Sequence, residues 1–259
     1  MGSQIKPDSP RLRRNQVRIH QKVNLIVPLY KKEAVFARFL RHCESELTNV
    51  RLVIVVFDPD NSWRGGRSAE ALKATSLETQ TVIINAQFSR SVALDRGAGV
   101  MRPQDLMLFV DVDVSVASGA LDSVRRLVDP GVSVYFPIVF SQFGRDSANA
   151  SSTTGASGYW RQHGYGMAAM FKSDYVGMDT TIVGWGKEDV ALYTKFLTQT
   201  NLTVYRAPEP NLVHIYHPVT CDPQLSADQY RMCQASADNT FRSSVDSALA
   251  LKKLGILDD

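Results

Sequence analysis

Short apolar, β-branched runs recur along the first half of this chain, and they constrain its fold more than any other feature. The runs have the length of strands, and the stretches between several of them are amphipathic and helix-like. The predicted strands are 23–29, 51–57, 81–85, 106–113 and 132–140, and the predicted helices are 32–47, 68–75, 89–100 and 118–128. This alternation predicts an α/β fold with a mainly parallel central sheet flanked by helices.

The alternation weakens after residue 141. Residues 141–158 are rich in Ser, Gly, Ala and Asn, which is typical of a surface loop. A helix is predicted to begin in GWGKEDVALYTKFL (184–197), and a further strand, 202–208, precedes NLVHIYHP (211–218). The face of this helix that we expect to be apolar consists of Val190, Tyr193, Phe196 and Leu197.

The charge of the chain is unevenly placed. Residues 1–22 carry six Lys and Arg residues against one acid, so the small net charge of +3 belongs to this arm and the remainder is slightly acidic. We therefore predict no nucleic-acid partner. The arm is expected to be a basic linker or leader, with contact to an anionic partner as the alternative, and residues 23–259 are expected to form a single domain.

The sequence also bears on the cellular compartment. No apolar run approaches the roughly 18 to 20 residues that cross a bilayer, and no secretory signal is evident. Two glycosylation sequons, beginning at Asn149 and Asn201, favour a secretory compartment. Three cysteines, Cys43, Cys221 and Cys233, decide nothing by themselves, and the last two lie in a loop-like segment.

The run LMLFVDVDVSV (106–116) places two carboxylates, Asp111 and Asp113, at the end of a predicted buried strand. Side chains alternate along a strand, so both are expected on one side, with Val112 facing away. Ligands of open α/β sheets bind beyond the carboxyl ends of the strands. Two close carboxylates repel unless a proton or a cation compensates them, and oxygen ligands favour Mg²⁺ or Mn²⁺ over zinc. The alternative is an acid pair hydrogen-bonded to neighbouring loops.

The segment HIYHP places His214 and His217 after a late strand, where an imidazole would suit Mn²⁺ beside carboxylates. In an extended segment the two rings face opposite sides, so only one is expected to bind. Pro218 favours an extended His217, which makes His217 the preferred ligand. The alternative is a hydrogen-bonded structural histidine.

In GWGKED, two glycines allow a turn that presents Trp185 as a flat wall for the apolar face of a sugar. Glu188 and Asp189 follow in the first helical turn, where a correctly placed carboxylate accepts a proton from a sugar hydroxyl. The alternative is that Trp185 belongs to the core and that the acids only favour the helix N-terminus, worth ~0.3–1 kcal/mol each.

In that order, FVDVD, GWGKEDV and HIYHPVTCDPQLSADQYRMC resemble the C-terminal domain of chondroitin synthases and chondroitin N-acetylgalactosaminyltransferases. These proteins are relatives of the β-1,4-galactosyltransferases and have the GT-A fold. PIVFSQF, YWRQHGYGM and FSRSVALDRGA are also similar to segments of that family, and the resemblance runs from about Val23 to Leu251.

The resemblance implies a role for individual residues. Asp113 and His217 would bind the metal, Mn²⁺ with Mg²⁺ as the alternative, and His214 would be a nearby metal or diphosphate contact. Asp189 would be the catalytic base, with Glu188 beside it. The implied donor-binding residues are Pro28, Leu29, Phe88, Arg90, Asp95, Asp111 and Val112. Those implied on the acceptor and donor-sugar side are Trp185, Gly186, Tyr165 and Gly166.

The implied reaction is an inverting, Mn²⁺-dependent transfer of GalNAc from UDP-GalNAc, in β1,4 linkage, to the terminal glucuronate of a chondroitin oligosaccharide or polysaccharide. A second chondroitin synthase-family subunit is an expected partner. The resemblance also implies a Cys221–Cys233 disulfide and a Golgi lumen setting, as the soluble domain of a type II membrane protein. The alternatives are a non-catalytic accessory subunit of a chondroitin polymerase, a glycan-binding module, or a β1,4-transferase using UDP-Gal or UDP-GlcNAc.

Overall fold

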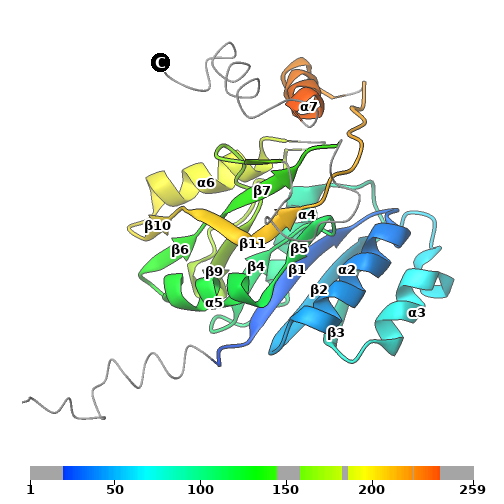
Figure 1. The fold of residues 1–259 in the computed structure, drawn as a ribbon, viewed down its shortest axis with the longest axis horizontal. Coiled ribbons are helices and arrows are strands. Elements are labelled where there is room, and N and C mark those ends of the chain that lie inside the picture. The colour runs from blue at the N-terminus through cyan, green and yellow to red at the C-terminus, as the bar shows by residue number, and fades with distance from the viewer. Residues whose placement is uncertain (1–19, 145–157, 183–185, 224, 240–259) are drawn as a thin grey trace, which may run out of the picture.

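The computed structural model describes residues 20–144, 158–182, 186–223 and 225–239, and a seven-stranded sheet lies at its centre (Figure 1). The strand order is β10-β6-β9-β4-β1-β2-β3. Its strands are β1 (Val23–Leu29), β2 (Val50–Phe57), β3 (Glu78–Ile84), β4 (Leu106–Phe109), β6 (Ser133–Tyr135), β9 (Ala168–Phe171) and β10 (Thr203–Tyr205). Only the pairings of β9 with β4 and β6 are antiparallel, so the predicted mainly parallel sheet is confirmed.

A second, four-stranded sheet has the order β5-β11-β7-β8. Its strands are β5 (Val114–Val116), β7 (Ile138–Gln142), β8 (Gly158–Trp160) and β11 (Pro208–His214). Because β5 follows β4 directly, the two sheets meet where the main sheet reaches its carboxyl edge.

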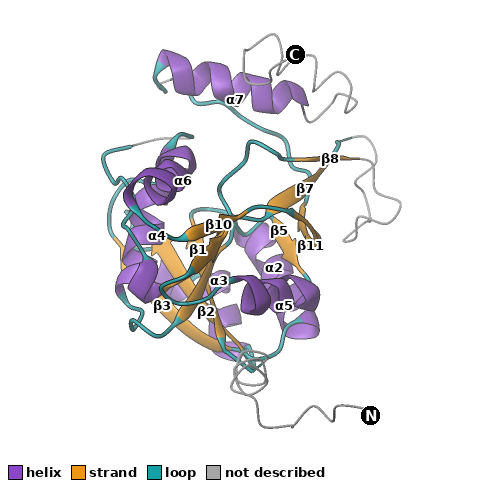
Figure 2. Cartoon of the chain, turned by 90° about the vertical axis from the view of Figure 1, so that its left-hand side faces the viewer, coloured by secondary structure: helices purple, strands orange, loops and turns teal. Residues whose placement is uncertain are grey.

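The helices cover both faces of the main sheet. They are α2 (Glu33–Glu46), α3 (Arg67–Ala74), α4 (Arg90–Gly99), α5 (Ser118–Leu127), α6 (Glu188–Gln199) and α7 (Ala227–Asn239), with short 3-10 turns at Trp63–Gly65 and Lys172–Asp174. Apolar residues of α2, α3 and α5 join one core cluster and those of α4 and α6 join another. Figure 2 shows α2 and α5 on one side of the sheet, α4 and α6 on the other, and α7 above the edge.

Two predicted strands are broken in the structure. The expected strand 106–113 ends at Phe109, and the expected strand 132–140 divides into β6 and β7, which belong to different sheets. Pro137 lies at the second break, and since proline has no N–H to donate, the chain leaves one ladder there before joining the other. The expected strand 81–85 begins earlier, at Glu78, because β3 pairs with nearly the whole length of β2.

Helix α6 starts at Glu188, as expected, but only half of the predicted apolar face is confirmed, since Phe196 is buried and Tyr193 packs against the core while the other two residues are exposed. Val190 is 38% exposed and Leu197 is 56% exposed, whereas Leu192 and Phe196 are buried. These two buried residues are four apart and lie on one side of a helix, so they set its rotation against the sheet.

The C-terminal segment differs from expectation as well, because Cys233 lies in α7 rather than in a loop. The expected strand 202–208 is also shorter, since β10 ends at Tyr205 and β11 begins at Pro208. Within the described ranges, no helix combines the length and the hydropathy that a membrane span requires.

Candidate active site

Asp111 and Asp113 lie in a tight turn between β4 and β5 rather than within a strand. The N–H of Val114 donates to the carbonyl of Asp111 at 3.0 Å. Strand β5 then pairs antiparallel with β11, with Val114 opposite His214, and the N–H of Ile215 donates to the carbonyl of Asp113 at 2.8 Å. This register brings a late strand to the aspartates, and the turn sends the two carboxylates to different partners.

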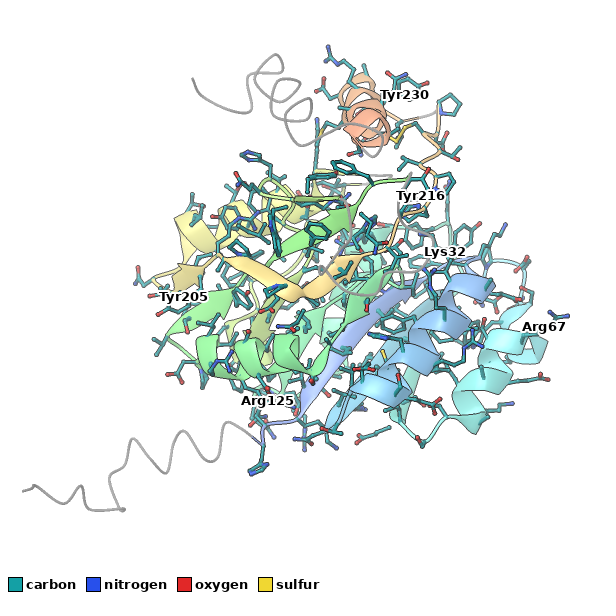
Figure 3. The ribbon with its side chains drawn as sticks, in the orientation of Figure 1. Lys32, Arg67, Arg125, Tyr205, Tyr216 and Tyr230 are labelled. Carbon is teal, nitrogen blue, oxygen red and sulfur yellow. A yellow bond between two sulfur atoms is a disulfide. The ribbon has the colours of Figure 1, made fainter. Side chains whose placement is uncertain are left out.

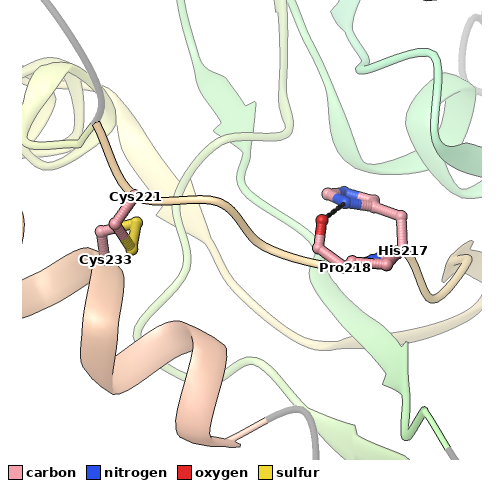
Figure 4. The surroundings of a disulfide bond; sticks show 4 residues. All are labelled: His217, Pro218, Cys221 and Cys233. Carbon is pink, nitrogen blue, oxygen red and sulfur yellow. Dashed lines mark hydrogen bonds between the residues drawn. A yellow bond between two sulfur atoms is a disulfide. The ribbon is translucent and has the colours of Figure 1, made fainter. Parts of the chain in front are cut away.

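Asp113 forms a compact group with the two histidines of HIYHP. One possible ligand atom from each of Asp113, His214 and His217 lies within 4.8 Å of the others. The Nε2 atom of His217 is 3.1 Å from Oδ2 of Asp113, and that of His214 is 3.9 Å from Oδ1. The Nδ1–H of His217 donates to the carbonyl of Pro218 at 3.0 Å (Figure 4), and Nδ1 of His214 lies 3.1 Å from the Ser141 hydroxyl. In both rings Nε2 faces the carboxylate.

Both histidines reach Asp113, whereas an extended 214–217 segment would have sent their rings to opposite sides. Strand β11 ends at His214, so the alternation stops there. The ring centroids are 5.2 Å apart. The expectation that the rings diverge is therefore wrong, and both imidazoles are candidate ligands.

The surroundings set the protonation of this group. Burial alone would raise the pKa of Asp113, but His217, His214 and Lys32 outweigh it and hold that pKa well below its usual range. Lys32, which Figure 3 shows near this end of the sheet, places Nζ 2.8 Å from Oδ2 of Asp113. Burial, and then the charge of Arg161, lowers the pKa of His214 to about 3, while the hydrogen bond to Asp113 raises that of His217. A carboxylate and a neutral imidazole are the forms that bind divalent cations.

One carboxylate and two imidazoles make a mixed oxygen and nitrogen donor set. Such a set fits a divalent transition metal such as Mn²⁺ better than Mg²⁺, which prefers oxygen ligands. Three protein atoms also leave coordination positions for oxygen atoms of a bound substrate. Asp113, His214 and His217 are thus the residues that could hold a cation.

Asp111 contacts Arg90 instead of the histidines. Arg90 begins α4, and its Nε donates to Oδ1 of Asp111 at 2.9 Å. Its Nη2 donates to the carbonyl of Gly166 at 2.8 Å, and its Nη1 lies 3.6 Å from Oε1 of Glu188. Burial would lower the pKa of Arg90, but the carboxylates of Asp111 and Glu188 outweigh it and raise that pKa. One guanidinium therefore joins the β4–β5 turn, the segment before β9 and the start of α6.

Asp189 is held by two backbone N–H groups. Its Oδ2 accepts from the N–H of Tyr165 at 3.1 Å, and its Oδ1 accepts from that of Val190 at 2.9 Å. The neighbouring Glu188 is only 6% exposed, and burial raises its pKa. Asp189 is half-buried, so of the two acids it is the more accessible from solvent.

A hollow lies at the carboxyl ends of β2 and β3. A cavity of about 340 Å³ is lined by Asp58, Asn61, Arg64, Ile83 and Asn85. A smaller hollow shares Asp58 and extends to Leu29, Tyr30 and Lys32, and Lys32 in turn contacts Asp113. Asp58 was not predicted from the sequence, although an acid directly after the apolar run 51–57 repeats the position of Asp111 after its own run.

The predicted donor-binding residues are only partly grouped around this hollow. Leu29 lines it beside Pro28 at the end of β1, and the ring of Phe88 stacks on that of Tyr30 with centroids 5.6 Å apart. Val112 is 5% exposed and belongs to the core. Asp95 accepts a hydrogen bond from the hydroxyl of Tyr175 at 3.0 Å, so its contact is with the segment that precedes α6.

Two further predictions concern the segment before α6. Trp185 lies outside the described residues, as does Asn149. Gly186 has φ +85°, which suits glycine, and a Cβ there would come within 3.9 Å of Met232 on α7. The turn before the acids therefore depends on its glycine and lies close to α7.

A disulfide joins Cys221 to Cys233, the pair that the family resemblance implies (Figure 4). It ties α7 to the chain that leaves the histidines. Lys187 Nζ also lies 3.2 Å from Oδ2 of Asp228 on α7. Through these contacts α7 is held next to the start of α6.

Comparison with known proteins gives this geometry a family. Residues 9–245 match the family described as Chondroitin N-acetylgalactosaminyltransferase. Chondroitin sulfate synthase 3 of Homo sapiens is 34% identical over 248 residues, which cover 88% of this chain and 28% of that protein. Chondroitin sulfate N-acetylgalactosaminyltransferase 1 of Homo sapiens is 34% identical over 235 residues, 83% of this chain and 44% of that protein. The chain thus spans less than half the length of either relative.

Solved structures agree on the fold. Glucosyl-3-phosphoglycerate synthase from Mycobacterium tuberculosis superposes with a TM-score of 0.56 at 12% identity, over 99% of this chain and 88% of that one. The fold is therefore the GT-A glycosyltransferase fold, as predicted. With the family match over most of its length, this chain belongs to the chondroitin N-acetylgalactosaminyltransferase family of glycosyltransferases.

Proposed function

We propose that this domain transfers GalNAc from UDP-GalNAc to the 4-hydroxyl of a terminal glucuronate of chondroitin, in β1,4 linkage, with inversion and with Mn²⁺ as its metal. The observation that carries this proposal is the group of Asp113, His214 and His217 at the sheet edge. Beside it, Arg90 joins Asp111 to Glu188, the residue next to Asp189. The names of the relatives support the donor and the polymer. A structural neighbour crystallised with Mn²⁺ and UDP supports the metal and the nucleotide.

The donor end of the reaction uses the hollow and the candidate metal site. The nucleoside occupies the cavity beside Asp58, and the diphosphate lies toward Lys32 and Asp113, because the smaller hollow shares Asp58 with the cavity and includes Lys32, which contacts Asp113. A divalent cation held by Asp113 and the two histidines would neutralise the charge that develops on the departing diphosphate. Lys32 supplies a further positive charge on the same side.

The acceptor end uses Asp189. The acceptor O4 forms a bond to the anomeric carbon while the bond from that carbon to the β-phosphate oxygen breaks. The electron pair of the broken bond leaves with UDP, and the proton of O4 passes to Asp189. The N–H groups of Tyr165 and Val190 hold this carboxylate in place, and Glu188 stays buried against Arg90. A positioned base of this kind contributes typically 10²–10⁴-fold.

The Cys221–Cys233 disulfide supports an oxidising compartment, so we place the domain in the Golgi lumen. Growth of a polymer by alternating sugars requires a second activity that adds glucuronate, which another chondroitin synthase-family subunit would supply.

The test measures transfer and binding separately. The purified domain is incubated with Mn²⁺, a glucuronate-ended chondroitin oligosaccharide and UDP-GalNAc, UDP-Gal or UDP-GlcNAc, and the products are weighed by mass spectrometry. We expect a gain of one N-acetylhexosamine with UDP-GalNAc alone. Asp189→Asn should keep Mn²⁺-dependent UDP binding by calorimetry but lose at least about 100-fold in turnover. Asp122→Asn, an exposed acid on α5, is the control.

Three other outcomes would each change the proposal. UDP-sugar hydrolysis without an acceptor product would favour the accessory-subunit alternative. Transfer of another hexose would correct the donor. Near-normal turnover in Asp189→Asn would remove this residue as the base.

A further inference from the structure

The loop between β8 and β9 is gathered around one side chain from elsewhere in the chain. Arg206, between β10 and β11, donates from Nη2 to the carbonyls of Arg161 at 3.3 Å and Gly164 at 3.1 Å, and also to that of Gln162. Nη2 carries two N–H groups, so the three carbonyls share them, while Nη1 donates to the carbonyl of Phe136 at 3.5 Å. The path of residues 161–164 is therefore fixed by Arg206.

The same guanidinium packs on aromatic rings. It lies 4.3 Å from the ring centroid of Tyr165 and 5.8 Å from that of Tyr193. These two rings are themselves stacked, with centroids 4.2 Å apart and planes inclined by 19°. Tyr193 lies on α6, one turn after Asp189, so the stack joins Arg206 and the loop to the helix that carries the candidate base.

Tyr165 reaches that base through its main chain. Its N–H donates to Oδ2 of Asp189 at 3.1 Å. The position of a backbone N–H follows the path of its loop, and the carbonyls of that loop are held by Arg206. Within the described part of the chain, Arg206 forms no hydrogen bond to the Asp113 group or to the carboxylate of Asp189, although its charge acts on that carboxylate through space.

We propose that Arg206 is a positioning residue for Asp189, acting through the 161–165 loop. This inference rests on the proposed role of Asp189. Removing the guanidinium frees the loop carbonyls and the Tyr165 ring, which shifts the N–H that orients the base. Arg206 lines neither hollow and is not among the candidate metal ligands, and Arg161, whose charge acts on His214, keeps its side chain. The defect should therefore fall on turnover and not on donor binding.

The first measurement is kinetic. Arg206→Met should lower kcat by roughly 10- to 100-fold, as expected when a reacting group is misplaced by about 1 Å. The Kd for UDP with Mn²⁺ should stay within about 2-fold, since no donor contact is lost. Arg206→Lys keeps the charge but not the planar fork, so it should recover only part of the loss. Gln162→Ala, which removes an exposed side chain from the same loop but keeps its carbonyl, is the control and should behave as wild type.

The second measurement is a double-mutant cycle. If Arg206 acts through Asp189, then Arg206→Met should cost less than about 3-fold in the residual turnover of Asp189→Asn, because the group that it positions is gone. A full loss in that background would overturn the inference, as would unchanged kcat in Arg206→Met alone. If Arg206→Met fails to fold, Arg206→Lys carries the same cycle. Normal turnover of Asp189→Asn by itself would instead refute the proposed base, so the two failures are distinguishable.

Discussion

Replacing Arg90 by Met should weaken the fold and the site together, because this one side chain joins three segments. Arg90 bonds to Asp111 at 2.9 Å and to the carbonyl of Gly166 at 2.8 Å, and it lies 3.6 Å from Glu188. Its side chain is 13% exposed. Methionine fills a similar volume but leaves all three partners without their cation.

The magnitude follows from how far each partner is buried. Removing one member of a buried ion pair costs roughly 3–5 kcal/mol, because the other charge stays uncompensated. The Glu188 side chain is 8% exposed, and its Oε2 already has no hydrogen-bond partner within the described part of the chain, so it bears most of this cost. Asp111 is 33% exposed and regains water. We therefore expect a loss of about 3 kcal/mol and a fall in Tm of roughly 10 °C, at 2–4 °C per kcal/mol for a domain of this size.

The assay is urea unfolding followed by circular dichroism, with Arg96→Met, an exposed arginine of the same helix, as the control. Adding Glu188→Gln to Arg90→Met removes the stranded charge and should restore roughly 1–2 kcal/mol. A loss below about 1 kcal/mol in Arg90→Met, or a double variant less stable than the single one, would contradict this reasoning.

Two further variants test the packing and the electrostatics beside the site. Gly97→Ala should lower the free energy of unfolding by roughly 1–3 kcal/mol, because a Cβ would lie 2.3 Å from Cγ2 of Ile26. Gly99→Ala, whose Cβ would have nothing within 4 Å, should raise it by about 0.5 kcal/mol. Equal stabilities of the two variants in thermal unfolding would contradict the clash at Gly97. Burial raises the pKa of Glu188 above its ordinary 4.5, so its carboxylate form weakens the fold above that raised pKa. Arg90 keeps Asp111 as its counter-charge when Glu188 is neutral, so Glu188→Gln should have a higher Tm than wild type at neutral pH, with the difference vanishing below about pH 4.5. A difference that does not change with pH would contradict this reasoning.

The sequence by itself determined the class of fold. Runs such as 23–29 and 51–57 are apolar at every position but one, which is typical of a strand buried on both faces, and they correspond to β1 and β2 in the structure. The helices between them follow, because parallel neighbours need crossovers. The order of the FVDVD, GWGKED and HIYHP segments also identified the candidate acids and histidines.

Only the tertiary structure decided how these residues meet. Local pattern predicted that Asp111 and Asp113 share a side and that His214 and His217 do not, but the two aspartates have different partners and the two rings meet. The reason is that β4 ends at Phe109 and β11 ends at His214, so the alternation of a strand does not continue through either pair. Where each strand ends is set by its partner's register, which is a long-range property.

The same reason explains what the sequence did not predict at all. Arg206 directly follows the short edge strand β10, and no sequence motif surrounds it. Its role depends on carbonyls that a distant loop turns toward it, and periodicity along a chain carries no information about such a contact. The class of fold follows from residues close together in the sequence, whereas the strand ends and the candidate site depend on residues that the fold brings together.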